Sequence, residues 1–323
     1  MLGLDGGFTR RARRSIGHVG VDTSFDRGAR PPRASAGWSG DAETIRRLCH
    51  AAAKACRGSK AERRDVAANF GEATGDGELP IDAGKVHTET GGRDVKVATV
   101  AVREPAEPCP AEDLQARALP RPSVRHGIAG IEAAAAFGPR CKAEAGKVGL
   151  PDVKGRTALG DGGAWIWNLS GEPFAAAGQA PDLDHAPGYL ADLARAGCGG
   201  DTAAAAAWTR HAQLARVADG WAGVGALVHG SQAEWNDPPA LESASPRVAN
   251  SPWGHQDRRT SAARLRRGAS VGSGRIEGAI NHLVGRRIQP TGARWKTDHL
   301  GPMVELIRLG PTEDWDTSWS DAA

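Results

Sequence analysis

Apolar and polar residues alternate in two neighbouring stretches of the chain. One stretch covers residues 78–82 and the other 94–102. Such alternation is typical of strands that bury one face. Gly91 and Gly92 lie between the stretches, where a tight turn needs glycine. The pattern predicts a β-hairpin, and it predicts a further short strand over 157–159.

Steps of three and four residues dominate elsewhere and are typical of amphipathic helices. Glycine, arginine and proline are frequent in residues 1–40, which we expect to be poorly ordered. Residues 230–254 have the composition of a loop. The predicted helices cover 41–72, 123–148, 185–196, 202–219, 257–267, a short segment beginning near 275, and 298–309.

Length and cysteine content narrow the class of protein. A chain of 323 residues can bury a substantial core. Its five cysteines form an odd set without a C-x-x-C pair, which argues against a disulfide framework and a zinc ribbon. No apolar run approaches the ~20 residues that cross a bilayer. We therefore expect a soluble protein of the cytoplasm.

Positive charge is concentrated in one part of the sequence. The net charge is only +3, but residues 258–296 contain ten Arg and Lys residues and a single acid, Glu277. A basic tract of this kind suits the phosphate backbone of a nucleic acid.

Three acidic residues stand out by their context. Asp82 ends a predicted strand, Asp161 follows another strand among glycines, and Glu277 is isolated in the basic tract. Carboxylates that converge in one cavity can hold two Mg²⁺ ions, which stabilise charge during phosphodiester cleavage. Acids at strand ends are also common as turn residues and helix caps, so the pattern alone leaves both interpretations open.

Several short motifs resemble those of ISKra-type insertion-sequence transposases, which are related to the Mutator-like group. The similarity covers roughly residues 15–320 and lies in the order and spacing of the motifs. They are IDAGKV (81–86), GRDVKV (92–97), LGDGGAWIWNL (159–169), DLDHA (182–186), YL (189–190), GSGRIEG (272–278), GRR (285–287), TGARW (291–295) and a WD pair near 315.

The resemblance implies an α/β fold with an RNase H-like mixed-sheet core. It also implies a helical insertion between the second and third catalytic acids. Four regions follow from it. They are an N-terminal Arg-rich and helical region that would be a truncated end-recognition part (1–76), the first part of the core (77–184), a helical insertion and loop (185–256), and C-terminal helices that complete the core (257–323).

The resemblance also implies roles for individual residues. Asp82, Asp161 and Glu277 would be the catalytic acids and would bind two Mg²⁺ ions, for which Mn²⁺ can substitute. Asp182 and His185 would support the site, although a histidine at a helix start is more often a capping or core residue. The implied DNA contacts are Arg275, Arg286, Arg287, Arg294, Trp295 and Lys296. Base stacking and core packing are equally open for the tryptophan.

The implied activity is Mg²⁺-dependent DNA strand cleavage followed by strand transfer. Its partners would be double-stranded DNA, at the element ends and at the target, and further copies of the chain. Some positions depart from the family pattern: Asp184 replaces an aromatic residue, and RRTS (258–261) replaces a tyrosine-bearing segment. Two alternatives therefore stay open, a catalytically inactive DNA-binding relic and an unrelated metal-dependent nuclease.

Overall fold

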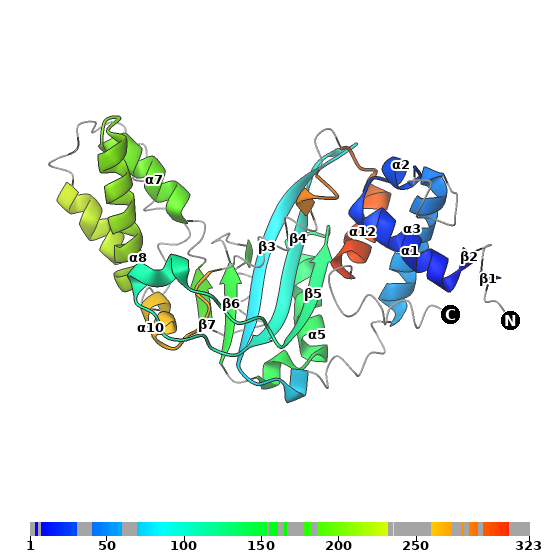
Figure 1. Cartoon of the computed structure of the whole chain (residues 1–323), viewed down its shortest axis with the longest axis horizontal. Coiled ribbons are helices and arrows are strands. Elements are labelled where there is room, and N and C mark those ends of the chain that lie inside the picture. The colour runs from blue at the N-terminus through cyan, green and yellow to red at the C-terminus, as the bar shows by residue number, and fades with distance from the viewer. Residues whose placement is uncertain are drawn as a thin grey trace.

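The structure, a computed structural model, describes most of the chain. The described residues are 4–5, 8–30, 41–59, 70–153, 155–160, 165–166, 178–181, 186–231, 235, 260–272, 280, 284–289 and 293–309. Figure 1 shows a twisted sheet in the middle of the molecule, with one group of helices near the N-terminus and another at the opposite end. In the described part, no helix is both long enough and apolar enough to cross a membrane.

The central sheet is mixed. Its strands are β3 (Asp76–Thr88), β4 (Gly91–Arg103), β5 (Val124–Gly130), β6 (Arg156–Gly160) and β7 (Gly178–Pro181), in the order β5-β4-β3-β6-β7. Strand β4 is antiparallel to both β3 and β5, whereas β6 is parallel to both β3 and β7. This α/β topology is compatible with an RNase H-like core.

The predicted hairpin is confirmed, and its strands are longer than predicted. The chain turns at Glu89 and Thr90, and Gly91 then adopts a φ of 116°, which glycine tolerates without strain. The predicted strand over 157–159 is also confirmed, as β6.

The prediction of one helix over 123–148 was wrong in its first part. Residues 124–130 form β5, and only the remainder is helical, as α5 (Ala134–Lys147). Local composition favours helix here because alanine is abundant. The edge of β4 decides the outcome, since β5 pairs with it from Val102↔Val124 to Lys96↔Gly130.

One face of the sheet is covered by α5. Phe137 and Cys141 of this helix are fully buried against Ile81 and Val100 of the central strands. Two short 3-10 helices, η1 (Ala111–Ala116) and η2 (Leu150–Asp152), lie in the connections before β5 and before β6.

The other face is covered by helices from both ends of the chain. These are α1 (Arg10–Asp22), α2 (Phe25–Gly28), α3 (Ala42–Ser59) and α12 (Thr297–Leu309). Their apolar side chains form one cluster with β3, β4 and β5, which includes Ile16, Ile45, Val86, Val97 and Leu306. The last predicted helix, over 298–309, is thus confirmed.

The expectation that residues 1–40 are poorly ordered was wrong for residues 8–30. Thr9 caps α1 by accepting a hydrogen bond from the backbone N of Ala12 (3.2 Å), and Ser24 caps α2 in the same way. Apolar residues of α1 are few, but Ile16 finds its partners in distant α3 and α12, which local composition cannot reveal. Residues 31–40 lie outside the described part, as does a two-residue gap after β1 (Leu4–Asp5) and before β2 (Phe8–Thr9).

A helical lobe lies between β7 and the C-terminal elements in the sequence. It contains α7 (Ala186–Gly197) and α8 (Thr202–Ser231), in agreement with the predicted helices over 185–196 and 202–219. At Gly220 the backbone leaves helical geometry (φ 65°, ψ −152°), and the chain folds back. Trp208 Nε1 then donates a hydrogen bond to Ser231 Oγ (2.8 Å), which closes a helical hairpin.

The predicted basic helix over 257–267 is present as α10 (Thr260–Arg266). Most of the predicted loop over 230–254 lies outside the described residues. The same holds for most of the short helix predicted near 275, of which residue 280 is described.

Candidate functional site

Asp82 lies on β3 directly beyond the last residue pair that β3 shares with β6. That pair is Ile81↔Gly160, and Gly160 ends β6. The carboxylate is half-buried, and its Oδ1 accepts a hydrogen bond from the backbone N of Ala83 (2.6 Å). The strand therefore holds the first predicted acid at the carboxyl end of β6.

Side-chain alternation places Asp82 on the face of the sheet that α5 does not cover. Ile81 is fully buried in the cluster beneath α5, so its neighbour faces the other way. Two residues further along, Gly84 lies against Ile280 and Val284. A β-carbon added at Gly84 would be 3.2 Å from Ile280 Cγ2 and 3.0 Å from Val284 Cγ1. Ile280 and Val284 thus lie against the same face of β3 as Asp82.

The end of β6 is closely packed. A β-carbon at Gly160 would be 2.7 Å from Ile166 Cγ2, a distance that real side chains do not reach, so only glycine fits here. Ile166 is fully buried, and the Trp165 ring lies 5.8 Å from Lys96 Nζ. Gly160 and Ile166, which precede and follow Asp161 in the sequence, are therefore in close contact.

Several predicted site residues lie outside the described part of the chain. Asp82 is the one described acid of the predicted three, and among the described residues no group of three His, Cys, Asp or Glu side chains could hold a metal ion. The residues outside are Asp161, Asp182, His185, Arg275 and Glu277.

Two of the predicted DNA contacts lie in the interior. Arg287 and Trp295 are 5% and 8% exposed. The guanidinium of Arg287 lies close to both the ring of Phe25 (4.7 Å) and the ring of Trp295 (5.0 Å), and its Nε donates to Gly20 O (2.8 Å). Burial lowers the pKa of Arg287 to about 10, so the group remains charged at neutral pH. Both side chains serve packing in the free protein.

The other described residues of this set are exposed. Arg286, Arg294 and Lys296 each point to solvent, on either side of the two buried residues. The basic tract therefore alternates between cations that hold the fold together and cations that are accessible to a ligand.

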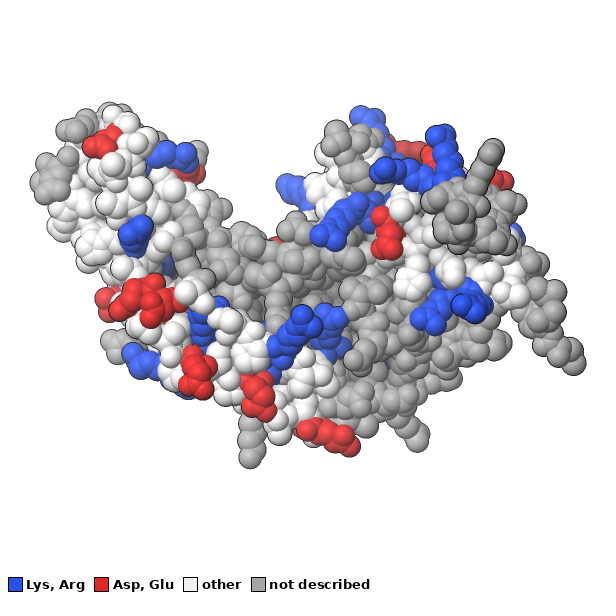
Figure 2. Space-filling model, in the orientation of Figure 1, with Lys and Arg blue, Asp and Glu red and all other residues white. Residues whose placement is uncertain are grey.

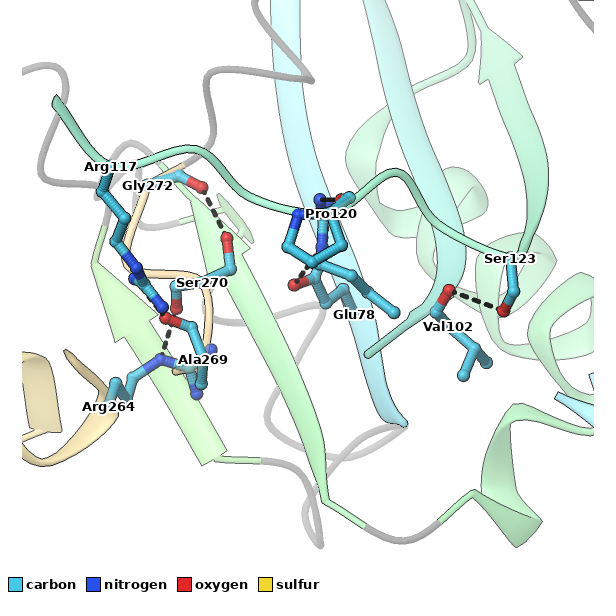
Figure 3. Close-up of polar contacts among 10 residues, drawn as sticks. Glu78, Val102, Arg117, Pro120, Ser123, Arg264, Ala269, Ser270 and Gly272 are labelled. Atoms are coloured by element: carbon cyan, nitrogen blue, oxygen red, sulfur yellow. Dashed lines mark hydrogen bonds and ion pairs between the residues drawn. The ribbon is translucent and has the colours of Figure 1, made fainter. Parts of the chain in front are cut away.

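A second buried arginine of the tract anchors α10 to the sheet. Arg264 Nη1 donates to Thr157 Oγ1 of β6 (2.6 Å), and its Nε donates to Ser270 O (2.6 Å). Figure 3 shows this group beside Arg117, which donates to Ala269 O (2.9 Å). Burial lowers the pKa of Arg264 to about 10, and nearby Glu78 opposes that shift. These bonds fix the chain that leads towards residue 277.

Glu78 of β3 forms a buried ion pair with Arg103 of β4. Its Oε2 is 2.7 Å from Arg103 Nη2, and Arg103 Nε donates to both carboxylate oxygens. Arg103 Nη1 also donates to Pro120 O (2.5 Å). The bonds join β3, β4 and the 105–122 connection into one rigid unit.

Sequence reasoning missed the exposed cations of the hairpin. Lys85 and Arg93 lie near its end and point to solvent. The sequence contained a signal for both residues, because they fall within the motifs IDAGKV and GRDVKV. The end of the hairpin was, however, expected only to turn the chain.

Figure 2 shows a hollow between the α7–α8 lobe and the part formed by the hairpin end and α1–α3. Lys and Arg side chains line its rim on the hairpin side. The carboxyl ends of β6 and β7 are directed towards this hollow in Figure 1.

Comparisons with known proteins give a structural likeness but no sequence match. No model of a known protein family matches the chain, and no curated protein matches its sequence. Among solved structures, the Drosophila P element transposase strand transfer complex is similar, with a TM-score of 0.40 and 9% sequence identity over 97% of this chain and 94% of that chain. At this level the likeness defines neither the family nor the function of the chain.

Proposed function

We propose that the protein is a transposase of the Asp-Asp-Glu type. It cleaves a DNA strand at the end of an insertion sequence and joins the freed 3′-hydroxyl to target DNA. The catalytic carboxylates are those of Asp82, Asp161 and Glu277. Copies of the chain act together on paired DNA ends in the cytoplasm, on the nucleoid.

The register between β3 and β6 carries the proposal. Gly160 pairs with Ile81 in a parallel ladder, and Asp161 and Asp82 are the next residues in the sequence after this pair. Neighbouring strands lie ~4.8 Å apart, which lets two carboxylates reach one divalent ion. Gly160 faces Ile166 on the α5 side, so alternation favours the opposite side, that of Asp82, for the next residue.

The third acid is supported by its distance along the chain from a described residue. Glu277 precedes Ile280 by three positions, and residues three apart share a face in a helix. Ile280 contacts the position of Gly84, two residues from Asp82 on the same face of β3. A helix through 277 and 280 would direct both side chains towards this face.

The donor set suits Mg²⁺. Carboxylate oxygens are the hard ligands that this ion prefers, and Asp82 is held in place by its strand and by the bond from Ala83 N. Bound there, Mg²⁺ would activate the attacking hydroxyl and stabilise charge on the attacking and leaving oxygens. The protein's own residues position the DNA, with Arg275 and the exposed Arg286, Arg294 and Lys296 on phosphates, while Asp182 and His185 support the acids.

Cleavage of an end-labelled duplex that carries the element's own end tests the proposal. We expect strand cleavage and joining with Mg²⁺ or Mn²⁺, and loss of both in Asp82→Asn while DNA binding is kept. Asp94→Asn is the matched control, because Asp94 is an exposed acid of the same hairpin. Equal activity in wild type and Asp82→Asn would exclude the proposal.

The same assay separates the alternatives. The departures at Asp184 and at residues 258–261 favour an inactive relic, which would bind the duplex and leave it intact with either metal. A nuclease unrelated to transposition would cut the duplex but join no end to target DNA.

A further inference from the structure

A third segment of chain is attached to the end of the β3–β4 hairpin. Trp295 N donates to His87 O (3.1 Å), and Glu89 N donates to Trp295 O (3.0 Å), which forms a parallel bridge between Thr88 and Trp295. The hydroxyls of Thr90 and Thr297, 207 positions apart in the sequence, are 3.4 Å apart. The segment 293–297 thus extends the sheet along the edge of β3.

Trp295 fixes this segment. Its ring is buried, its Nε1 donates to Ile288 O (2.8 Å), and it meets the ring of Phe25 edge-on at 6.4 Å. The residues on either side, Arg294 and Lys296, are exposed. A buried anchor between two exposed cations gives these cations a defined place at low entropic cost.

The hairpin adds further cations to the same end. Lys85 and Arg93 are exposed there, and Arg286 is exposed just before the buried Arg287. Of the exposed acids nearby, Asp94 lies opposite Lys85 in the strand register, and Asp298 lies in the first turn of α12, where it stabilises the helix. The cations other than Lys85 are four, and the exposed acids near them include Glu89 of the turn and Asp26, beside the Phe25 ring that meets Trp295.

These four cations are available to a ligand. Among the residues that the structure describes, Arg93, Arg286, Arg294 and Lys296 form no ion pair, in contrast to the interior Arg103 and Arg308. Exposed, unpaired guanidinium and ammonium groups on a rigid frame are what phosphate oxygens bind.

The α7–α8 lobe lacks this excess. Its charged residues between 186 and 231 are three arginines and three aspartates, so their charges balance. They are Asp192, Arg195, Asp201, Arg210, Arg216 and Asp219. An excess of exposed positive charge thus distinguishes the hairpin end from the α7–α8 lobe.

We propose that the hairpin end, formed by Arg93, Arg286, Arg294 and Lys296, binds the sugar–phosphate backbone of duplex DNA. This inference rests on the proposed function for the choice of partner. Thr88 follows Asp82 by six residues on β3, which corresponds to roughly 20 Å at ~3.3 Å per residue. The contacted phosphates therefore lie roughly six base pairs from the scissile one, at 3.4 Å per base pair.

Fluorescence anisotropy of a labelled duplex, titrated over a range of salt concentrations without divalent metal, tests this surface. The variant Arg93→Gln/Arg294→Gln/Lys296→Gln removes three charges from the hairpin end. The matched control Arg121→Gln/Arg195→Gln/Arg210→Gln removes three exposed charges elsewhere. Circular dichroism and thermal melting check that both variants fold.

The slope of log K against log salt concentration is negative, and we expect its magnitude to decrease by about 0.9 for each lost contact, or by roughly 2 to 3 in the hairpin variant. The control should keep the wild-type slope. An unchanged slope in the hairpin variant, or equal loss in both variants, would overturn the proposal.

Because the assay needs no cleavage, its result is independent of the catalytic acids. If the wild type cleaves DNA and the hairpin variant keeps the wild-type salt dependence of binding, the proposed catalytic function stands and the inference about the hairpin end is wrong. If the hairpin variant loses salt-dependent binding and the wild type does not cleave DNA, the inference stands and the proposed catalytic function is wrong.

Discussion

Gly84 of β3 lies directly against Val284, since a β-carbon added to Gly84 would be 3.2 Å from Cβ of Val284. The contact matters because it brings the chain that follows Glu277 over the strand that carries Asp82. Glycine at this position leaves the space that the branched side chains of Val284 and Ile280 occupy.

This contact predicts a disulfide. With the five native cysteines replaced, Gly84→Cys/Val284→Cys should oxidise readily, because disulfides need Cβ atoms about 3.5–4.5 Å apart and a small shift suffices. Non-reducing electrophoresis and mass spectrometry would detect the bond. The pair Gly92→Cys/Val284→Cys, with Gly92 exposed at the hairpin end, should stay reduced. Failure of the first pair to oxidise would show that the two segments do not meet in solution.

Replacing Arg287 should destabilise the protein far more than replacing its neighbour. Arg287→Ala removes two ring contacts and the hydrogen bond to Gly20 O, each worth about 0.5–2 kcal/mol, so we expect a loss of about 2–4 kcal/mol. Arg286→Ala, at an exposed position, should change the free energy of unfolding by less than about 0.5 kcal/mol. Urea unfolding of both variants checks this, and equal losses would contradict the packing role.

The buried Glu78–Arg103 pair should behave as a coupled unit. Glu78→Leu leaves a charged guanidinium in the interior and should cost about 3–5 kcal/mol. The double variant Glu78→Leu/Arg103→Leu should recover much of that loss, because no charge stays unpaired. Chemical denaturation of the wild type, both single variants and the double variant measures the coupling. Strictly additive losses would show that the pair is not coupled.

Acid should weaken the contact between α3 and α12 through His50. The rings of His50 and His299 are 5.0 Å apart, and Arg46 Nη1 lies 3.2 Å from His50 Nδ1. Burial lowers the pKa of His50 to about 4, and the charges of Arg46 and His299 add to that shift while Glu43 opposes it. In the unfolded chain His50 binds a proton near pH 6.5, whereas in the folded chain it does so only near pH 4. The free energy of unfolding therefore decreases as the pH falls from 6.5 to 4.

The free energy of unfolding, measured by urea titration between pH 7 and pH 4, checks this. We expect His50→Gln to lose less stability than the wild type over this interval. His229→Gln, which changes an exposed histidine of α8, should follow the wild type. Parallel pH curves for the wild type and His50→Gln would contradict the assignment.

The sequence predicts local features well where a regular pattern meets a local signal. The hairpin, β6, α12 and the end of the first α8 segment at Gly220 all combine a periodic pattern with a glycine or a cap. β5 was missed because its Val124–Gly130 sequence becomes a strand only by pairing with β4. β7 was missed for the same reason, since its pairing with β6 is all that distinguishes it.

The candidate site, too, could be predicted from the sequence only in part. The position of Asp82 at a strand end could be predicted from the sequence. The burial of Arg287 and Trp295 could not, because it depends on Phe25 and Gly20, more than 260 positions away. Charge alone gave all basic residues of the tract the same role, whereas the packing of α1–α3 on the sheet separates structural cations from accessible ones.

The central claim is that Asp82, Asp161 and Glu277 bind the same metal ions, and metal-directed cleavage of the polypeptide tests it most directly. Fe²⁺ placed in a Mg²⁺ site reduces added hydrogen peroxide to hydroxyl radicals, with ascorbate returning Fe³⁺ to Fe²⁺, and the radicals cut the chain beside the metal, where mass spectrometry locates the cuts. We predict cuts next to all three residues, suppressed by excess Mg²⁺ and absent in Asp82→Asn. Cuts beside Asp82 alone, or an unchanged pattern in Asp82→Asn, would contradict the shared site.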